Sequence, residues 1–156
     1  MKKTVFVAML LLGGASHGEV ITKHDRFRNT TTMTYAQPAR SDIVEFHAFS
    51  VFDGESPASK RRNTIMLSST SESWKYLRCR SVDFLIDGKL FSAPAPNHDG
   101  RAGRGYVLEF LSFSIPTEVI KKIGAAQLVE YRVCNDEYVL GVDDIKGLAE
   151  LVKDAK

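Results

Sequence analysis

Alternating apolar and polar positions predict a chain made mainly of β-strands over its first two thirds. The alternating stretches are rich in β-branched and aromatic residues, which favour strands. An Asp87-Gly88 pair between two of them is a two-residue hairpin signal. Strands joined by such short turns pair antiparallel, so an antiparallel sheet of about five to seven strands is expected. The predicted strands cover residues 28–35, 43–52, 64–68, 75–86, 89–92, 106–115, 128–134 and 137–140.

The alternation within residues 75–86 changes parity partway along. Leu77 and Cys79 fall on one face of this predicted strand, whereas Val82 and Phe84 fall on the other. A β-bulge adds one residue to a strand and restores a common face. The pattern therefore predicts one long strand with a bulge near residues 80–81.

Two amphipathic helices are predicted in the C-terminal half. Pro116 and Glu118 mark the start of the first helix, and Asp143 is expected to cap the second. Each helix carries one apolar stripe that can pack on the same face of a sheet. The fold class is therefore expected to be α+β, a two-layer sandwich, with a closed barrel and appended helices as the alternative. The two stripes are Val119, Ile120, Ile123 and Ala126, and Ile145, Leu148, Ala149 and Val152.

The first eighteen residues have the order of a secretory signal peptide. Two lysines precede an apolar stretch over residues 4–12, and small residues follow it. The stretch is shorter than the roughly 20 residues that span a bilayer. We therefore expect a cleavable signal over residues 1–18, cut after Ala15 or Gly18, and export to the periplasm or beyond in a bacterium. Residues 19–156 are expected to form one α+β domain, with an irregular segment over 19–42.

Removal of this signal changes the charge of the chain. The full sequence has 21 Lys and Arg against 19 Asp and Glu, and two of the lysines lie in residues 1–18. The remaining chain is balanced, with 19 basic (21 minus 2) and 19 acidic side chains. A balanced chain creates no long-range field that attracts nucleic acid. We therefore expect no nucleic-acid partner, and no membrane span once the signal is removed.

Two cysteines, Cys79 and Cys134, lie 55 positions apart. An even number of cysteines in an exported chain indicates a disulfide. Two separate core thiols are the alternative, because free cysteine is also commonly buried. The sequence therefore predicts a disulfide bond between Cys79 and Cys134.

The strongest candidate for chemistry is the stretch Asn97-His-Asp-Gly-Arg-Ala-Gly-Arg-Gly105. Its glycines allow backbone amides to approach an anion, and its guanidinium groups can bind a carboxylate or phosphate with two hydrogen bonds. Two prolines and three glycines within residues 93–105 argue for an irregular loop. The candidate ligand-binding residues are His98, Asp99, Arg101 and Arg104, and a connector with solvated charges is the alternative.

The remaining polar residues give no complete catalytic pattern. His47 is expected to be a hydrogen-bonded strand histidine, and it would need His98 and a third ligand to hold a metal. Glu109, on an otherwise apolar strand face, is either a paired core carboxylate or a general acid. No cofactor is predicted. The sequence favours a non-enzymatic module that binds a protein, peptide or envelope component; the alternative is a small periplasmic hydrolase or metal-dependent enzyme using His98 and Asp99.

Overall fold

A computed structural model describes residues 18–37, 44–56 and 60–155, so the signal peptide expected over residues 1–18 lies almost wholly outside the described residues. The described residues form ten strands and two helices. In chain order these are β1 (Val20–Asp25), β2 (Thr30–Ala36), β3 (Glu45–Asp53), β4 (Arg62–Ser71), β5 (Val82–Ile86), β6 (Lys89–Ser92), β7 (Asn97–Gly103), β8 (Tyr106–Ser114), α1 (Thr117–Gly124), β9 (Val129–Val133), β10 (Asp136–Val139) and α2 (Val142–Val152).

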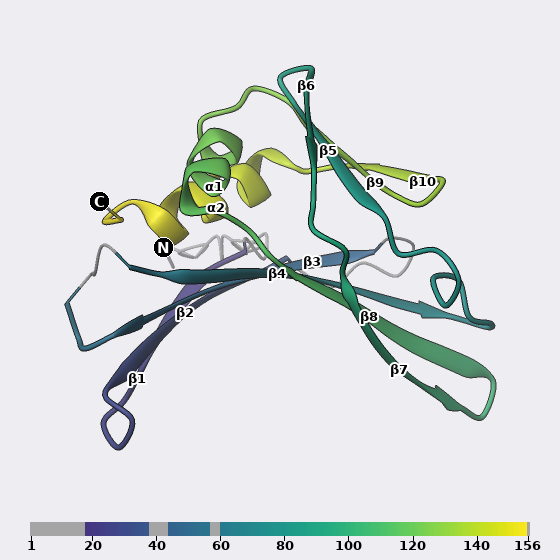
Figure 1. Ribbon diagram of the computed structural model, residues 1–156, viewed down its shortest axis with the longest axis horizontal. Coiled ribbons are helices and arrows are strands. Elements are labelled where there is room, and N and C mark those ends of the chain that lie inside the picture. The colour runs from purple at the N-terminus through teal and green to yellow at the C-terminus, as the bar shows by residue number, and fades with distance from the viewer. Residues whose placement is uncertain (1–17, 38–43, 57–59, 156) are drawn as a thin grey trace, which may run out of the picture.

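The larger sheet has six antiparallel strands in the order β1-β2-β3-β4-β8-β7. Its strands alternate as the sequence predicts: Phe46 and Ala48 of β3 and Ile65 and Leu67 of β4 are buried on one face. Both helices and the second sheet lie on that face of the larger sheet (Figure 1). This face therefore carries the core, and the opposite face is the outer face of the sheet.

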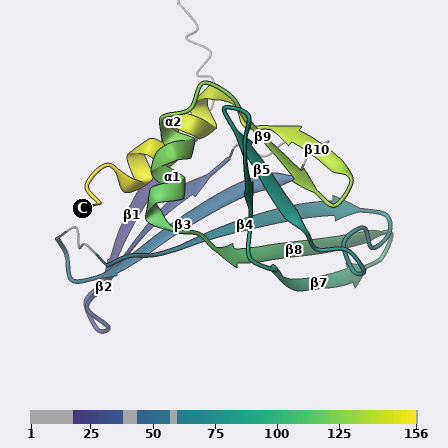
Figure 2. The same ribbon diagram turned by 45° about the horizontal axis from the view of Figure 1, so that its top comes forward.

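The smaller sheet has four antiparallel strands in the order β10-β9-β5-β6 and lies above the larger one (Figures 1 and 2). Its inner face carries an aromatic row in register across the strands, Tyr138-Tyr131-Phe84-Phe91. The ring of Tyr131 lies 5.9 Å from that of Phe46 in β3, centroid to centroid. Aromatic side chains bury large areas in such contacts. The core therefore fills the space between the two sheets.

The two helices pack against each other, and α2 also contacts β1, β2 and β3. A buried carboxylate fixes the start of α2: Asp144 accepts hydrogen bonds from the Gly141 amide (2.7 Å), the Tyr35 hydroxyl (2.5 Å) and the Gln37 side-chain amide (2.7 Å). The prediction that Asp143 caps this helix is wrong. Gly141 is the capping residue, and the side chain of Asp144, in the first turn of the helix, accepts a hydrogen bond from the Gly141 amide.

The predicted fold class is confirmed, since antiparallel strands carry two helices packed on one side. The number of strands and the number of sheets differ from the prediction of one sheet with about five to seven strands, because the described residues form ten strands in two sheets of six and four. Hairpin signals identify strands that are neighbours along the chain, but they do not say in which layer a hairpin lies. The segment over residues 19–42, expected to be irregular apart from a strand over 28–35, contains the paired strands β1 and β2, and β2 matches that predicted strand.

Two local predictions are corrected. The expected loop over residues 93–105 contains the regular strand β7, because both prolines precede it and an edge strand tolerates its glycines. The expected long strand over 75–86 begins only at Val82. Residues 72–81, which we call the covering segment, run instead across β8, with Tyr76 buried and Leu77 half exposed. The change of parity therefore marks the end of this segment and not a bulge.

The predicted disulfide is confirmed. Cys79, at the end of the covering segment, is bonded to Cys134, whose Cα lies 5.9 Å away in the β9–β10 turn. The bond ties this segment to the smaller sheet. Across residues 18–37, 44–56 and 60–155, no helix has the length and apolar character needed to cross a membrane.

Candidate functional site

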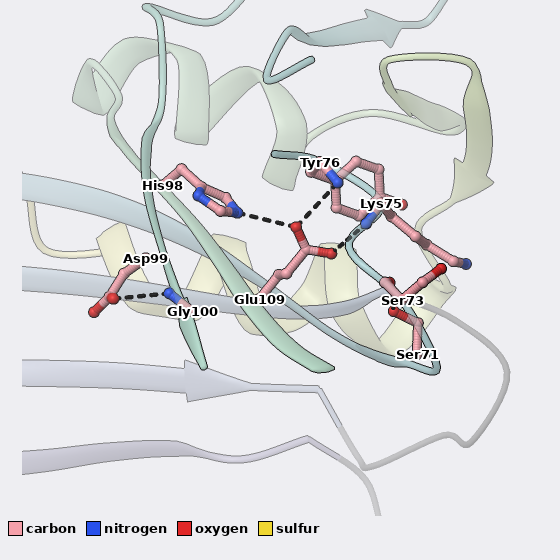
Figure 3. A network of polar contacts seen from close by, with 8 residues as sticks. All are labelled: Ser71, Ser73, Lys75, Tyr76, His98, Asp99, Gly100 and Glu109. Carbon is pink, nitrogen blue, oxygen red and sulfur yellow. Dashed lines mark hydrogen bonds and ion pairs between the residues drawn. The ribbon is translucent and has the colours of Figure 1, made fainter. Parts of the chain in front are cut away.

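The four predicted ligand-binding residues lie on or beside the edge strand β7, and they do not converge. His98 points inward from this strand, toward Glu109 (Figure 3). Asp99 and Arg101 occupy the alternate positions, on the outer face, and Arg104 lies in the turn that follows. Successive side chains of a strand point to opposite faces. His98 and Asp99 are therefore separated by the sheet itself.

His98 instead belongs to a buried polar cluster centred on Glu109 of β8. The Glu109 side chain is fully buried, and its Oε1 accepts from His98 Nε2 at 3.0 Å. The same oxygen accepts from the Tyr76 amide at 3.0 Å, and Oε2 accepts from the Lys75 amide at 2.7 Å (Figure 3). One carboxylate thus holds the covering segment to β8 through two backbone amides. Glu109 is a paired core carboxylate, which is one of its two predicted roles.

The surroundings of His98 favour this structural role over catalysis. The ring of Trp74 lies 5.8 Å from the His98 ring, centroid to centroid, and covers it. Gly100 leaves room for this cover, because a Cβ there would lie 2.7 Å from the Trp74 ring. Within the described part of the chain, no hydroxyl or thiol hydrogen-bonds to His98, whereas nucleophilic catalysis needs that contact.

A second histidine, His47 of β3, lies on the outer face of the larger sheet. It is a hydrogen-bonded strand histidine, as predicted, and its Nε2 lies 3.3 Å from Ser68 Oγ and 3.6 Å from Glu45 Oε2. Ser68 Oγ also donates to Glu45 at 3.2 Å. In a Ser-His-acid relay the two partners contact different ring nitrogens. Here the hydroxyl and the acid meet the same nitrogen, so the three side chains do not form a relay.

The alternative in which His47 and His98 share a metal ion does not fit the sheet. His47 lies on the outer face and His98 on the inner face, so the two rings cannot share an ion. Among the residues that the structure describes, no group of three or more His, Cys, Asp or Glu side chains could hold a metal.

Three tyrosine hydroxyls lie in buried or half-buried contacts that oppose their ionisation. Tyr76 donates to Asp136 (2.8 Å) and contacts the Tyr138 hydroxyl (3.2 Å), while Tyr35 donates to Asp144. Burial is the main cause that raises the pKa of all three tyrosines, and the hydrogen bonds of Tyr35 and Tyr76 raise theirs further. All three phenols are therefore held neutral by the folded structure.

These raised pKa values predict alkaline unfolding. A folded-state pKa above the unfolded value of 10.0 contributes stability that is present below pH 10.0 and is lost as the pH rises further. We expect unfolding, followed by circular dichroism, to coincide with the phenolate absorbance of these tyrosines. The Y35F and Y76F variants should each lose part of the phenolate absorbance that appears when the protein unfolds at high pH. A complete rise in phenolate absorbance while the dichroism stays native would contradict this assignment.

The outer face of the smaller sheet carries the clearest exposed apolar surface. One row in register runs Val139-Glu130-Leu85-Leu90 across all four strands. Leu90 is 68% exposed, Val139 58% and Leu85 39%. These residues line an open hollow of about 320 Å³. We call this surface the outer row.

The charges beside the outer row are unevenly paired. Arg132 binds Asp83 at 3.0 Å, and the hydrogen bonds from Ser92 and then Arg132 hold the pKa of Asp83 below its usual range. Glu130 and Glu137 also line the hollow. Neither has an ion-pair partner among the described residues. The surface therefore presents three carboxylates against one guanidinium, with two of the carboxylates free.

Sequence reasoning missed this surface, although a signal for it was present. The inward alternation of Phe84 and Ile86 places Leu85 on the opposite face, and the Asp87-Gly88 turn sets Leu90 across from it. Leucine at an outward position on both strands of one hairpin is unusual when that face meets only water. Apolar residues on both faces of the β5–β6 hairpin were therefore the sequence signal for an exposed apolar surface.

The fold and these surfaces define an α+β protein with two antiparallel sheets, a buried His-Glu cluster that holds a covering segment, and an exposed apolar row on its smaller sheet. No family model matches the chain, and neither a curated protein nor a solved structure matches it.

Proposed function

We propose that the chain is an exported, non-enzymatic binding module of the bacterial cell envelope that holds a protein partner on the outer face of its smaller sheet. The observation that carries this proposal is the outer row, in which Leu85 and Leu90 are exposed side by side and Val139 is exposed beyond Glu130, all lining one hollow. Contiguous exposed apolar patches with a polar rim are typical of protein-binding surfaces.

The charges of this face specify the partner. Glu130 and Glu137 are free, whereas Arg132 is occupied by Asp83. A partner that supplies Lys or Arg beside apolar side chains complements this arrangement. A second copy of the chain would bring the same excess of carboxylates and would be repelled. The partner is therefore a different protein with a basic, apolar surface.

The histidine clusters support a binding role over the hydrolase alternative. His98 and Glu109 use their hydrogen bonds to hold the covering segment, and His47 meets acid and hydroxyl at one nitrogen. Both arrangements stabilise the fold without presenting an activated nucleophile.

Site-specific photocrosslinking in living cells tests the proposal. A photoreactive phenylalanine analogue at Leu90 should give one defined covalent adduct, identified by mass spectrometry. Ile21 is the matched control, because it is 63% exposed on β1, an edge strand of the larger sheet. The adduct at Leu90 should disappear when Glu130 and Glu137 are both replaced by lysine.

The proposal has two clear failures. Absence of an adduct at Leu90 would overturn it. So would the same set of adducts from Leu90 and from Ile21, because that pattern reports exposure alone.

A further inference from the structure

A second hollow lies on the other side of the β5–β6 hairpin, between the edge strand β6 and helix α1. It measures about 390 Å³, with Ile86, Phe91 and Val119 among its apolar lining and Lys89 and Lys122 among its charged groups. We call it the β6–α1 groove. We propose that an extended acidic segment of the partner adds to β6 as a fifth strand and fills this groove. This inference rests on the proposed function and names the second contact that the partner makes.

The backbone of β6 is open to such an addition. β6 ends the order of the smaller sheet, so no described strand pairs with its outer edge. The Ala93 amide donates to Val82 O at 2.9 Å, which fixes the phase of the antiparallel hydrogen-bond ladder. By this alternation the amide and carbonyl groups of Leu90 and Ser92 point away from β5. A partner strand can therefore make main-chain hydrogen bonds there.

The charge of the groove selects acidic segments. Neither Lys89 nor Lys122 has an ion-pair partner among the described residues. Among the described residues that line the groove, Asp87 is the only acid, and its Oδ1 already accepts the amides of Gln127 (3.0 Å) and Leu128 (2.9 Å). Two free ammonium groups above an apolar floor complement a carboxylate next to an apolar side chain.

Because side chains alternate between the two faces of a strand, the two faces of an added strand would meet different residues, and this determines which sequences fit. Side chains on one face would meet Phe91, Val119 and the two lysines, and those on the other face would meet Leu90. The segment is therefore expected to combine Asp or Glu with Val, Ile or Thr. The β6 strand of a second copy carries a lysine and no acid, so it does not complement the groove.

The probe for this inference is a phage-displayed library of random heptapeptides, selected on the purified, oxidised protein. We expect enriched sequences to carry acidic and β-branched residues. The most enriched peptide is then synthesised, and its Kd is measured by fluorescence anisotropy. The K89E/K122E variant should weaken binding at least about tenfold. The K23E/K146E variant makes the same change of charge at exposed positions elsewhere and should bind normally.

Backbone methylation separates strand addition from simple charge attraction. N-methylation removes amide donors, so methylating alternate peptide positions should abolish binding in one register and leave it intact in the other. Enrichment of basic or proline-rich peptides, no enrichment, or equal affinity for K89E/K122E would overturn the inference. If the Leu90 crosslink persists in K89E/K122E while no peptide binds the groove, the proposed function stands and only this second contact is wrong.

Discussion

Replacing Glu109 with leucine is expected to destabilise the protein by about 3–5 kcal/mol, the largest effect of any single polar substitution proposed. The change leaves the amides of Lys75 and Tyr76 and the ring of His98 without their common acceptor. Each buried polar group that loses its partner costs about 1–3 kcal/mol. The covering segment should therefore detach from β8 before the sheets unfold.

Urea denaturation followed by tryptophan fluorescence measures this loss, because the single tryptophan, Trp74, lies in the covering segment against His98. D99N is the control: Asp99 is exposed on the same β7 strand, and within the part of the chain that the structure describes it accepts only the Gly100 amide beside it. We expect its effect to stay within about 0.5 kcal/mol. If E109L does not fold, E109Q keeps the shape of the side chain and should lose a smaller, measurable amount. A loss below about 1 kcal/mol in both variants would contradict the role of Glu109.

Removing the disulfide is expected to cost about 4 kcal/mol of unfolding free energy, because the bond closes a loop across 55 residues of sequence. The C79S/C134S variant should show this loss in urea denaturation. Adding a reductant should shift the wild-type curve toward that of the variant and leave the variant unchanged. Coincident curves for oxidised wild type and the variant would show that the covering segment is held by other contacts alone.

The two effects should not add. Glu109 holds the covering segment at Lys75 and Tyr76, and the disulfide holds its end at Cys79. Groups that share one segment are coupled, so the combined variant should lose less than the sum of the separate losses. The difference between the summed losses of unfolding free energy and the loss in the combined variant measures how far the covering segment unfolds as one unit.

The sequence by itself determined the features that depend on residues close together in the chain. The alternation of β3 and β8 and the Asp87-Gly88 turn were predicted correctly, because period and turn chemistry are local properties. The helix stripes were predicted in part: Ile120 and Ile123 of α1 and Ile145, Leu148 and Val152 of α2 are buried, but Ala126 lies beyond the end of α1, and Leu151 of α2 is buried where Ala149 was expected. The disulfide followed from the number of cysteines and the expected compartment. The same local rules gave Glu109 as an isolated carboxylate on an apolar face.

Only the tertiary structure decided which of these elements meet. The division into two sheets, the meeting of His98 with Glu109 across the β7–β8 hairpin, and the covering segment over both depend on where separate strands and segments lie relative to one another. Local pattern could place Leu85 and Leu90 on an outward face, but it could not show that nothing in the described chain covers them. Exposure and pairing are properties of the assembled layers, so the proposed binding surfaces emerge only once both sheets are in place.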